Sequence, residues 1–362
     1  MINSDIPALE TLIFHVTRAC NLKCRHCWQR ADSGSHADNN SGPGQGITPD
    51  VFSRLLDEAG SLGMRWVKFT GGEPLLHPGF PEYLKAAADH RLSITMETNA
   101  TLIDEAMADL LKYPKDISIS VSLDGSRPDI HDDFRGVRGA FQRTISGLKL
   151  LAERGLQVQI ITCLHRGNLS DLEAIIKLAR DCGAKSLKIN PVQPMGRGSN
   201  LDGDACLTVP ELLAMTDRWN SRAMTDFPGG VAFSLPLAFR PLAVIRQRQF
   251  SVCRIHHILG LLPNGDLSFC GVGNIDASLV IGNIFNEPLA ELWHRAPLIA
   301  ALRQGLPRHL KGVCAQCILK AICLGECRAL AYEQSRDLMG PYWICQEAYN
   351  AGLFPKSRLV NE

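Results

Sequence analysis

Short apolar segments alternate with longer amphipathic segments through the first half of the chain. The apolar segments have strand character and lie at residues 11–16, 66–69, 92–96, 117–123, 158–163 and 186–189. Between them, apolar residues recur at intervals of three and four, which predicts helices at residues 49–62, 81–90, 104–111, 140–154 and 170–182. Strands that alternate with helices are typical of parallel sheets with helical crossovers. The pattern therefore predicts an α/β fold, a parallel barrel that is partial rather than closed.

Polar residues and glycines follow several of the predicted strands. In parallel α/β barrels, functional residues collect at the carboxyl ends of the strands. Along the chain these positions hold a cysteine triplet at residues 20–27, then Gly71, Gly72, Glu73 and Pro74, then Glu97, Thr98 and Asn99, then Ser122 and Asp124, and finally Asn190 with residues 194–197. Taken singly, residues 71–74 could form an ordinary turn, and Asn99 or Asp124 could cap a helix. Their common place on one rim favours a functional site.

The charge balance argues against two classes of partner. The chain has 38 Lys and Arg against 37 Asp and Glu, a net charge of +1, so we expect neither nucleic acid nor a membrane as partner. No apolar run approaches the roughly 18 residues of a membrane span, and no signal peptide precedes Cys20. The 13 cysteines therefore indicate a reducing cytoplasm.

Ten of the 13 cysteines fall into two groups, one near each end of the chain. The first group, Cys20, Cys24 and Cys27, has the spacing C-x3-C-x2-C and would leave a four-iron cluster one ligand short, so that one iron could bind a substrate or cofactor. The second group is Cys253, Cys270, Cys314, Cys317, Cys323, Cys327 and Cys345. A disulfide framework is typical of small secreted domains and is disfavoured here. Zinc is a fairer alternative for residues 314–327, because C-x2-C pairs bind zinc well.

These motifs resemble those of the radical S-adenosylmethionine (SAM) enzymes. The segment HVTRACNLKCRHCW at residues 15–28 is similar to their cluster loop, and residues 71–74 are similar to their GGEP segment. The C-terminal spacing, C-x11-G-x4-C from Cys253 to Cys270, C-x2-C-x5-C-x3-C from Cys314 to Cys327, and then Cys345, resembles the SPASM extension, which carries auxiliary iron-sulfur clusters. The resemblance covers nearly the whole chain. It implies a partial (β/α)6 barrel at residues 1–207, a bridging region at 208–250 and a SPASM domain at 251–362.

The resemblance also implies the chemistry of the first group of cysteines. Cys20, Cys24 and Cys27 would hold a four-iron cluster whose open iron binds SAM, and one electron would then release a 5'-deoxyadenosyl radical that abstracts hydrogen from a substrate. Glycine at 71 and 72 lets the backbone approach the methionine part of SAM, and Glu73 can accept from its ammonium group. The expected cofactor-binding residues are Gly71, Gly72, Glu73, Pro74, Thr98, Asn99, Ser122 and Asp124.

Two further four-iron clusters are implied in the C-terminal region. By resemblance, Cys314, Cys317, Cys323 and Cys345 hold an outer cluster, and Cys253, Cys270 and Cys327 hold an inner one. Some relatives have a further cysteine where this chain has Leu259, so the fourth inner position could be open, or filled by His256, His257, Cys206 or a substrate atom. Cys206 is also a candidate hydrogen-atom donor. Cys163 and Cys182 lie in apolar patterns and are expected to be inert buried thiols.

SPASM-bearing relatives act mostly on peptides or proteins, so we expect a maturase of a ribosomally synthesised precursor peptide. Only 19 residues precede Cys20, which predicts that a separate protein recognises the leader of that precursor. A flavodoxin or ferredoxin would supply electrons. The alternatives are a maturase of a folded protein, of the sulfatase type, an enzyme acting on a small molecule such as a tetrapyrrole or quinone cofactor, and a non-catalytic iron-sulfur carrier. Residues 71–74 speak against the carrier.

Overall fold

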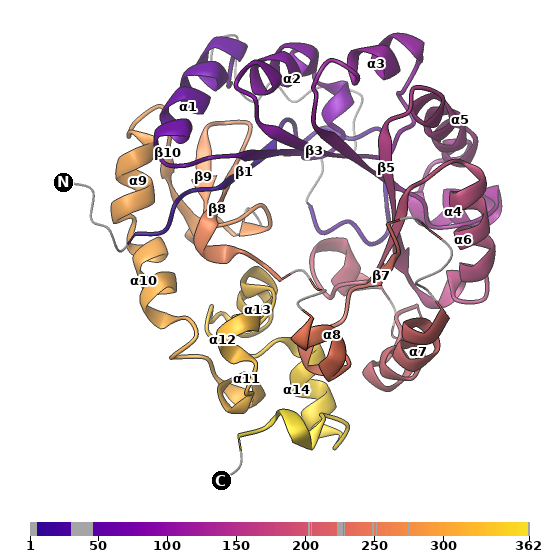
Figure 1. Cartoon of the computed structure of the whole chain (residues 1–362), viewed down its shortest axis with the longest axis vertical. Helices are drawn as coiled ribbons and strands as arrows, with labels where there is room; N and C mark the ends of the chain where they lie inside the picture. The colour runs from indigo at the N-terminus through magenta and orange to yellow at the C-terminus, as the bar shows by residue number, and fades with distance from the viewer. Residues whose placement is uncertain are drawn as a thin grey trace.

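The computed structural model describes residues 6–29, 46–201, 203, 205–222, 227, 229–247, 250, 252–273 and 276–360. A single sheet runs through this described part, with the strand order β10-β9-β8-β1-β2-β3-β4-β5-β6-β7. The strands are β1 (Thr11–His15), β2 (Trp66–Thr70), β3 (Ser93–Thr98), β4 (Ile117–Ser122), β5 (Gln157–Leu164), β6 (Ser186–Pro191), β7 (Val231–Phe233), β8 (Ile258–Leu261), β9 (Asp266–Ser268) and β10 (Val280–Asn283). Figure 1 shows this curved sheet with helices along its outer side.

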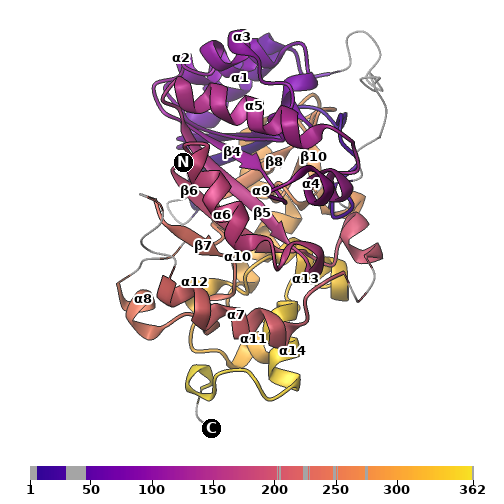
Figure 2. The same ribbon diagram turned by 90° about the vertical axis from the view of Figure 1, so that its right-hand side faces the viewer.

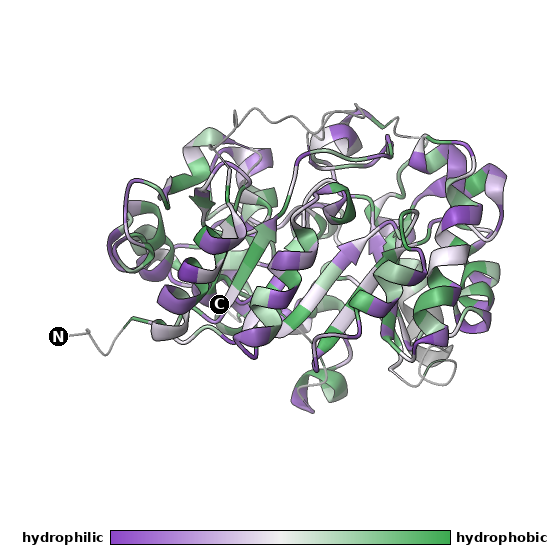
Figure 3. Cartoon of the chain, turned by 90° about the horizontal axis from the view of Figure 1, so that it is seen from above, coloured by the Kyte–Doolittle hydropathy of each residue, from purple (hydrophilic) through white to green (hydrophobic). Residues whose placement is uncertain are grey.

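The six predicted strands are β1 to β6, and all five contacts between neighbours are parallel. The five predicted helices are α1 (Pro49–Ser61), α2 (Phe80–Asp89), α3 (Glu105–Leu110), α5 (Ala140–Glu153) and α6 (Leu172–Asp181). Figure 3 shows hydrophobic residues along the central strands and both kinds of residue on the surrounding helices, as amphipathic helices require. The prediction of a partial parallel barrel is confirmed.

The helices begin and end where the sequence provides caps. Thr48 caps α1 by accepting a hydrogen bond from Val51 N (3.3 Å), and Pro49 occupies its first turn. The buried face of α1 includes Phe52, whose ring stacks on Phe14 of β1 with centroids 4.9 Å apart. This aromatic contact joins the first crossover helix to the strand that precedes the cysteine triplet.

The C-terminal region extends the same sheet instead of forming a separate one. Strand β8 pairs with β1 in parallel and with β9 antiparallel, which confirms the hairpin expected around Asn264 and Gly265, although the connection spans residues 262–265 instead of a two-residue turn. On the opposite edge, β7 from the bridging region pairs with β6. The sheet is therefore continuous across the expected boundaries at residues 207 and 250, and that division stays a prediction.

The short helices between residues 312 and 350 lie below the barrel in Figures 1 and 2. The other α-helices among the described residues are α4 (Pro128–Arg135), α7 (Val209–Arg222), α8 (Leu242–Arg246), α9 (Leu289–Arg295), α10 (Pro297–Gly305), α11 (Gly312–Gln316), α12 (Lys320–Cys323), α13 (Arg328–Ser335) and α14 (Trp343–Asn350). Helix α4 was not predicted, and it contributes directly to the site described next. No helix in the described ranges is long and apolar enough to cross a membrane.

Candidate active site

The cysteine triplet lies on a loop that follows β1 and is fixed by hydrogen bonds from two other parts of the barrel. Lys23 N donates to Arg135 O at the end of α4 (3.0 Å), and Arg197 N donates to Cys27 O (2.9 Å). The Arg197 guanidinium also donates to Cys24 O (2.8 Å). Because these bonds use the backbone of the loop, the protein itself sets the positions of the three thiols.

Gly71 and Gly72 pack directly against the start of this loop. Gly72 N donates to Thr17 O and Glu73 N donates to Ala19 O, each at 2.8 Å. A Cβ on Gly72 would lie 2.0 Å from Ala19 O, and one on Gly71 would lie 2.5 Å from Thr17 O. Gly71 also has a φ of +133°, which favours glycine. Both glycines are therefore needed for this backbone contact, a reason that the sequence did not reveal.

Glu73 points its carboxylate into the barrel end, where three donors already reach it. Its Oε1 accepts from Thr98 Oγ1 (2.7 Å) and Leu75 N (3.3 Å), and its Oε2 accepts from Asn99 N (2.8 Å). Its side chain is buried, and burial raises its pKa to about 7 despite these hydrogen bonds. A carboxylate offers about four acceptor sites, so one stays available for a ligand ammonium group.

The other predicted residues on the β3 rim serve mainly to hold the site together. Asn99 Nδ2 donates to Asn21 Oδ1 in the cysteine loop (2.8 Å), and Asn99 Oδ1 accepts from Thr101 N (2.9 Å). Thr98 holds the Glu73 carboxylate. Pro74 is buried at the start of a 3-10 turn, residues 74–76. These contacts position the cysteine loop against β3.

Asp124, which was expected to bind the cofactor, is fully buried behind the site. Its Oδ2 forms an ion pair with Arg135 Nη2 (2.7 Å), and its Oδ1 accepts from Cys163 N (2.7 Å). Arg135 Nη1 in turn donates to Cys24 Sγ (3.5 Å). In this structure Asp124 therefore orients Arg135, and Arg135 is the group that contacts the cysteine loop.

A chamber of about 430 Å³ joins the barrel end to the C-terminal region. On the barrel side it is lined by the three loop cysteines, Gly71, Gly72, Glu73, Thr98, Asn99 and Ser122. On the C-terminal side it is lined by Glu326, Cys327, Leu330 and Tyr342. The three loop cysteines and Cys327 of the C-terminal group, which are far apart in the sequence, thus face one space. A substrate there would contact both halves of the molecule.

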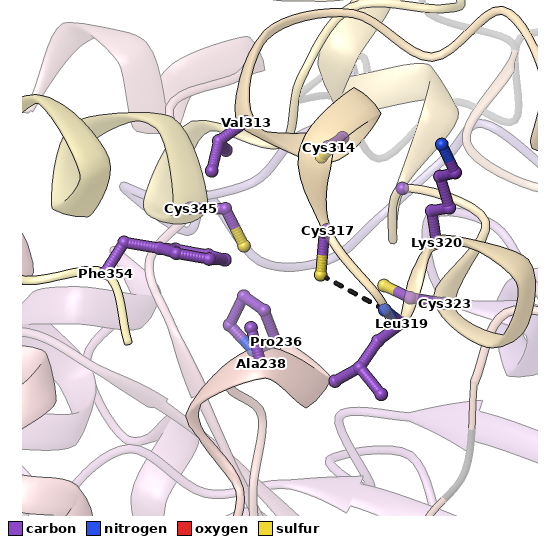
Figure 4. A pocket seen from close by; sticks show the side chains of 11 residues that line it. Pro236, Ala238, Val313, Cys314, Cys317, Leu319, Lys320, Cys323, Cys345 and Phe354 are labelled. Carbon is purple, nitrogen blue, oxygen red and sulfur yellow. Dashed lines mark hydrogen bonds between the residues drawn. The ribbon is translucent and has the colours of Figure 1, made fainter. Parts of the chain in front are cut away.

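Four of the C-terminal cysteines surround a separate small hollow. Cys314, Cys317, Cys323 and Cys345 line it, and Figure 4 shows their thiols together with Phe354 and Pro236. This is the set expected to hold the outer cluster. The cysteines come from α11, the turn after it, α12 and α14, so the hollow joins separate short segments. Leu319 N donates to Cys317 Sγ (3.4 Å), as hydrogen bonds to cluster sulfurs do.

The three inner cysteines also lie near one another. Burial raises the pKa of Cys270, and the nearby Cys327 and Cys253 thiols add to that effect. Leu259, where some relatives have a further cysteine, is a buried residue of β8, and of the candidate fourth ligands His257 bonds through Nδ1 to Ala8 O (3.1 Å).

Cys206, also a candidate, lies away from the chamber. It is not among the residues that line the chamber, and the charged neighbour that affects its thiol is Arg166. The structure therefore gives Cys206 no part in this site. His256 is half-buried in the 3-10 turn before β8.

The donor sets fit iron-sulfur clusters. Within the described residues, no group of three or more His, Cys, Asp or Glu side chains is arranged to hold a single metal ion. The four thiols around the hollow of Figure 4 supply the number of ligands that a four-iron cluster takes.

Sequence reasoning missed several residues that line the chamber. Arg135 ends α4, whose signals are Pro128 at its first turn and Gly136 at φ +73° after its end. Cys163, expected to be an inert core thiol, lies at the chamber wall. Lys188 and Glu326 line it too, from β6 and from the segment before α13. Lys188 alternates with buried Leu187 and Ile189, so the period of β6 could have placed it inside the barrel.

Comparison with protein families gives two matches. Residues 14–179 match the radical SAM superfamily, and residues 253–318 match the iron-sulfur cluster-binding domain called SPASM. Together the two matches cover more than half of the chain and include the loop cysteines, Gly71, Gly72, Glu73 and Pro74.

Similar proteins have different named activities. The chain is 29% identical to an AdoMet-dependent heme synthase of Methanosarcina barkeri, over 93% of this chain and 97% of that protein. It is 28% identical to the mycofactocin maturase MftC of Mycobacterium ulcerans, over 96% and 90%. Among solved structures, SuiB of Streptococcus suis bound to its precursor peptide SuiA has the same fold, with a TM-score of 0.72 at 18% identity, over 94% of this chain and 76% of that one.

Proposed function

Because the chain is a radical SAM enzyme with a C-terminal SPASM domain, we propose that it modifies a ribosomally synthesised precursor peptide by hydrogen abstraction in the chamber between its two cysteine groups. When bound at Cys20, Cys24 and Cys27, a four-iron cluster supplies the electron that splits SAM and yields the 5'-deoxyadenosyl radical. The residues of this chain bind, orient and shield the reactants. Residues 71–73 and the β3 rim hold the SAM end of the chamber, and the wall at Cys327 holds the far end.

The charge of the chamber is the observation that favours a peptide. Its described lining has three acidic residues, Glu73, Glu97 and Glu326, against two basic ones, Arg135 and Lys188. Arg135 is already paired with Asp124. A substrate with several carboxylates would need more cations than this lining offers, because buried charges must be paired. A peptide segment, whose backbone supplies both donors and acceptors, suits the lining better.

A second candidate is an enzyme that acts on a tetrapyrrole. The specific support for it is the similarity to the Methanosarcina barkeri heme synthase over nearly the full length of both chains. The mycofactocin maturase is similar over nearly the same share of this chain, and it is named as a maturase. The charge of the lining supports the peptide over the tetrapyrrole.

The test is a direct comparison of substrates. The chain would be reconstituted anaerobically with iron and sulfide, reduced with dithionite and supplied with SAM, and 5'-deoxyadenosine would be measured by chromatography. We expect a short precursor peptide encoded beside the gene to change in mass by a defined amount. An iron tetrapyrrole with propionate side chains, tested in parallel, should stay unchanged. Modification of the tetrapyrrole and not of the peptide would reverse the assignment.

The partner proteins follow from the same proposal. A flavodoxin or ferredoxin would replace dithionite as the electron donor. A separate leader-binding protein would raise the rate of peptide modification without changing its product. Equal rates with and without that protein, at every peptide concentration, would remove it from the proposal.

A further inference from the structure

Glu326 adopts a backbone conformation that a glycine would adopt at lower cost. Its φ is +60°, and it follows Leu324 at +53° and Gly325 at +73°. Leu324 has a structural reason for this conformation, since it ends helix α12. Glu326 ends no helix. A side chain in the left-handed region costs about 1 kcal/mol, and such residues concentrate at functional sites.

The surrounding structure holds this conformation in place. The buried Arg328 guanidinium donates to the Gly325 carbonyl oxygen, to Leu338 O (2.9 Å) and to Gly340 O (2.8 Å). Glu326 N donates to Cys323 O (3.0 Å). The backbone around Glu326 is therefore fixed on both sides, and its side chain is directed into the chamber.

The Glu326 carboxylate has almost no partner of its own. Its hydrogen bond within the described residues comes from the Cys323 thiol, at 3.6 Å. Cys323 is one of the four cysteines around the outer hollow, and a cysteine that binds a cluster is a thiolate with no proton to donate. With the cluster in place, Glu326 faces the chamber as an acceptor that lacks this donor.

No described cation lies within ion-pair distance of the carboxylate. Lys188, Arg240 and Arg328 are near enough to affect it. Lys188 lines the chamber from the barrel side and likewise forms no ion pair within the described residues. The chamber thus has the Glu326 carboxyl group on one wall and the Lys188 amino group on the other, and neither has an ion-pair partner within the described residues.

We infer that Glu326 is a substrate-binding residue that accepts a hydrogen bond from a donor group of the peptide, either a cationic side chain or a backbone N–H. The inference rests on the proposed function, because it names the recognition contact for that peptide. It places this contact on the SPASM wall, across the chamber from the loop with Cys20, Cys24 and Cys27. A strained glutamate at a position suited to glycine is explained by that contact.

Two substitutions separate binding from structure. Glu326→Gly removes the carboxylate and relieves the backbone strain, while Glu326→Gln keeps the size and one acceptor oxygen but removes the charge. Glu333→Gln, in α13 of the same region and outside the chamber lining, is the matched control. Each variant would be tested for iron content, melting temperature, peptide affinity by fluorescence anisotropy, and moles of modified peptide per mole of 5'-deoxyadenosine.

We expect Glu326→Gly to melt at or above the wild-type temperature and to bind the precursor peptide about tenfold to a hundredfold more weakly, the range for a hydrogen bond to a charged group. The ratio of modified peptide to 5'-deoxyadenosine should fall together with the peptide affinity. Glu326→Gln should match Glu326→Gly if the donor is cationic and lie between Glu326→Gly and wild type if it is a backbone N–H. The control should behave as wild type.

Three results would overturn the inference, and they are distinguishable. If wild type modifies the peptide and both Glu326 variants do so with unchanged affinity and ratio, Glu326 is not a binding residue, while the proposed function stands. Glu326 also loses its binding role if the variants lose iron or melting temperature in proportion to activity, because the carboxylate would then hold the two regions together. If wild type binds no peptide and modifies none, the proposed function fails and the inference fails with it.

Discussion

The cysteine loop at the barrel end and the separate outer hollow hold their cysteines in different ways. At the barrel end, one loop carries Cys20, Cys24 and Cys27, and its backbone is bonded to α4 and to the turn after β6. At the outer hollow, residues 312–323 bring three of the cysteines and α14 brings the fourth, Cys345, from further along the chain. The first arrangement is built by the barrel before a cluster binds. We expect the second to depend on a bound cluster to cross-link its two segments.

This difference assigns different tasks to the clusters. An open ligand position is useful only if the other ligands are held still, so that SAM meets one fixed geometry. The loop achieves this because Arg135 and Arg197 fix it from two sides. The outer site has four thiols and no position for a substrate, so its cluster would act as a structural cross-link or carry electrons.

The largest expected effect is on the barrel end. Replacing Cys20, Cys24 and Cys27 together by alanine should abolish release of 5'-deoxyadenosine, because the loop would then offer no thiolate to hold the cluster. The C-terminal clusters should stay loaded, so the variant should retain about two-thirds of the wild-type iron if there are three clusters. Iron analysis and chromatography measure both quantities. A reduced triple variant that still released 5'-deoxyadenosine would refute the assignment of this loop.

The next effect tests whether the outer site needs its cluster to hold its shape. Cys345→Ala should lose the outer cluster and expose α11 to α14 to protease and to hydrogen exchange, because short helices of this length are not stable alone. The barrel should stay protected. Cys182→Ala, at a buried cysteine outside both groups, is the matched control and should keep all its iron. Equal protection of α11 to α14 in both variants would show that the protein alone holds the outer site.

The strands and the cysteine sets could be predicted from the sequence, but the contacts between residues that are distant in the sequence could not. Strands β1 to β6 could be predicted because their apolar runs are buried, and the cysteine sets because their spacing is distinctive. Helix α4 was missed because it is short and carries few apolar residues. Its last residue, Arg135, reaches Cys24 only through the fold.

The roles of individual rim residues could not be predicted for the same reason. Asp124 follows β4 as expected, yet its carboxylate pairs with Arg135 and does not line the chamber, while Asn99 lines the chamber and also donates to Asn21. The position of a residue in a strand specifies which rim it occupies, but the nearest hydrogen-bond or ion-pair partner determines where its polar side-chain atoms point. The positive φ of Glu326 and its place in the chamber wall likewise could not be predicted from the sequence.

A smaller effect is expected for Glu73, which we expect to bind the ammonium group of SAM. Glu73→Ala should weaken SAM binding by about 1.5–3 kcal/mol, the range for a hydrogen bond to a charged group. Isothermal titration calorimetry on the cluster-loaded protein measures this. Glu82→Gln, at an exposed position in α2, is the control. Unchanged SAM affinity in Glu73→Ala would mean that Glu73 serves only to hold Thr98 and Asn99.

The smallest expected effect is a pH dependence that only the barrel end should show. Burial raises the pKa of Glu73 to about 7, above its ordinary value of 4.5, so the free protein holds a proton there that its unfolded chain has released. Stability without SAM should therefore fall as pH rises from 4.5 to 7. SAM carries an ammonium group that favours the ionised carboxylate, so SAM affinity should rise as the pH passes through the Glu73 pKa of about 7. From about pH 6 to about pH 8 the gain should be about tenfold, because at the lower pH roughly nine-tenths of Glu73 is protonated. Glu73→Gln has no proton to lose, so its SAM affinity should be flat between these pH values. The same slope in wild type and Glu73→Gln would assign the pH dependence to another group.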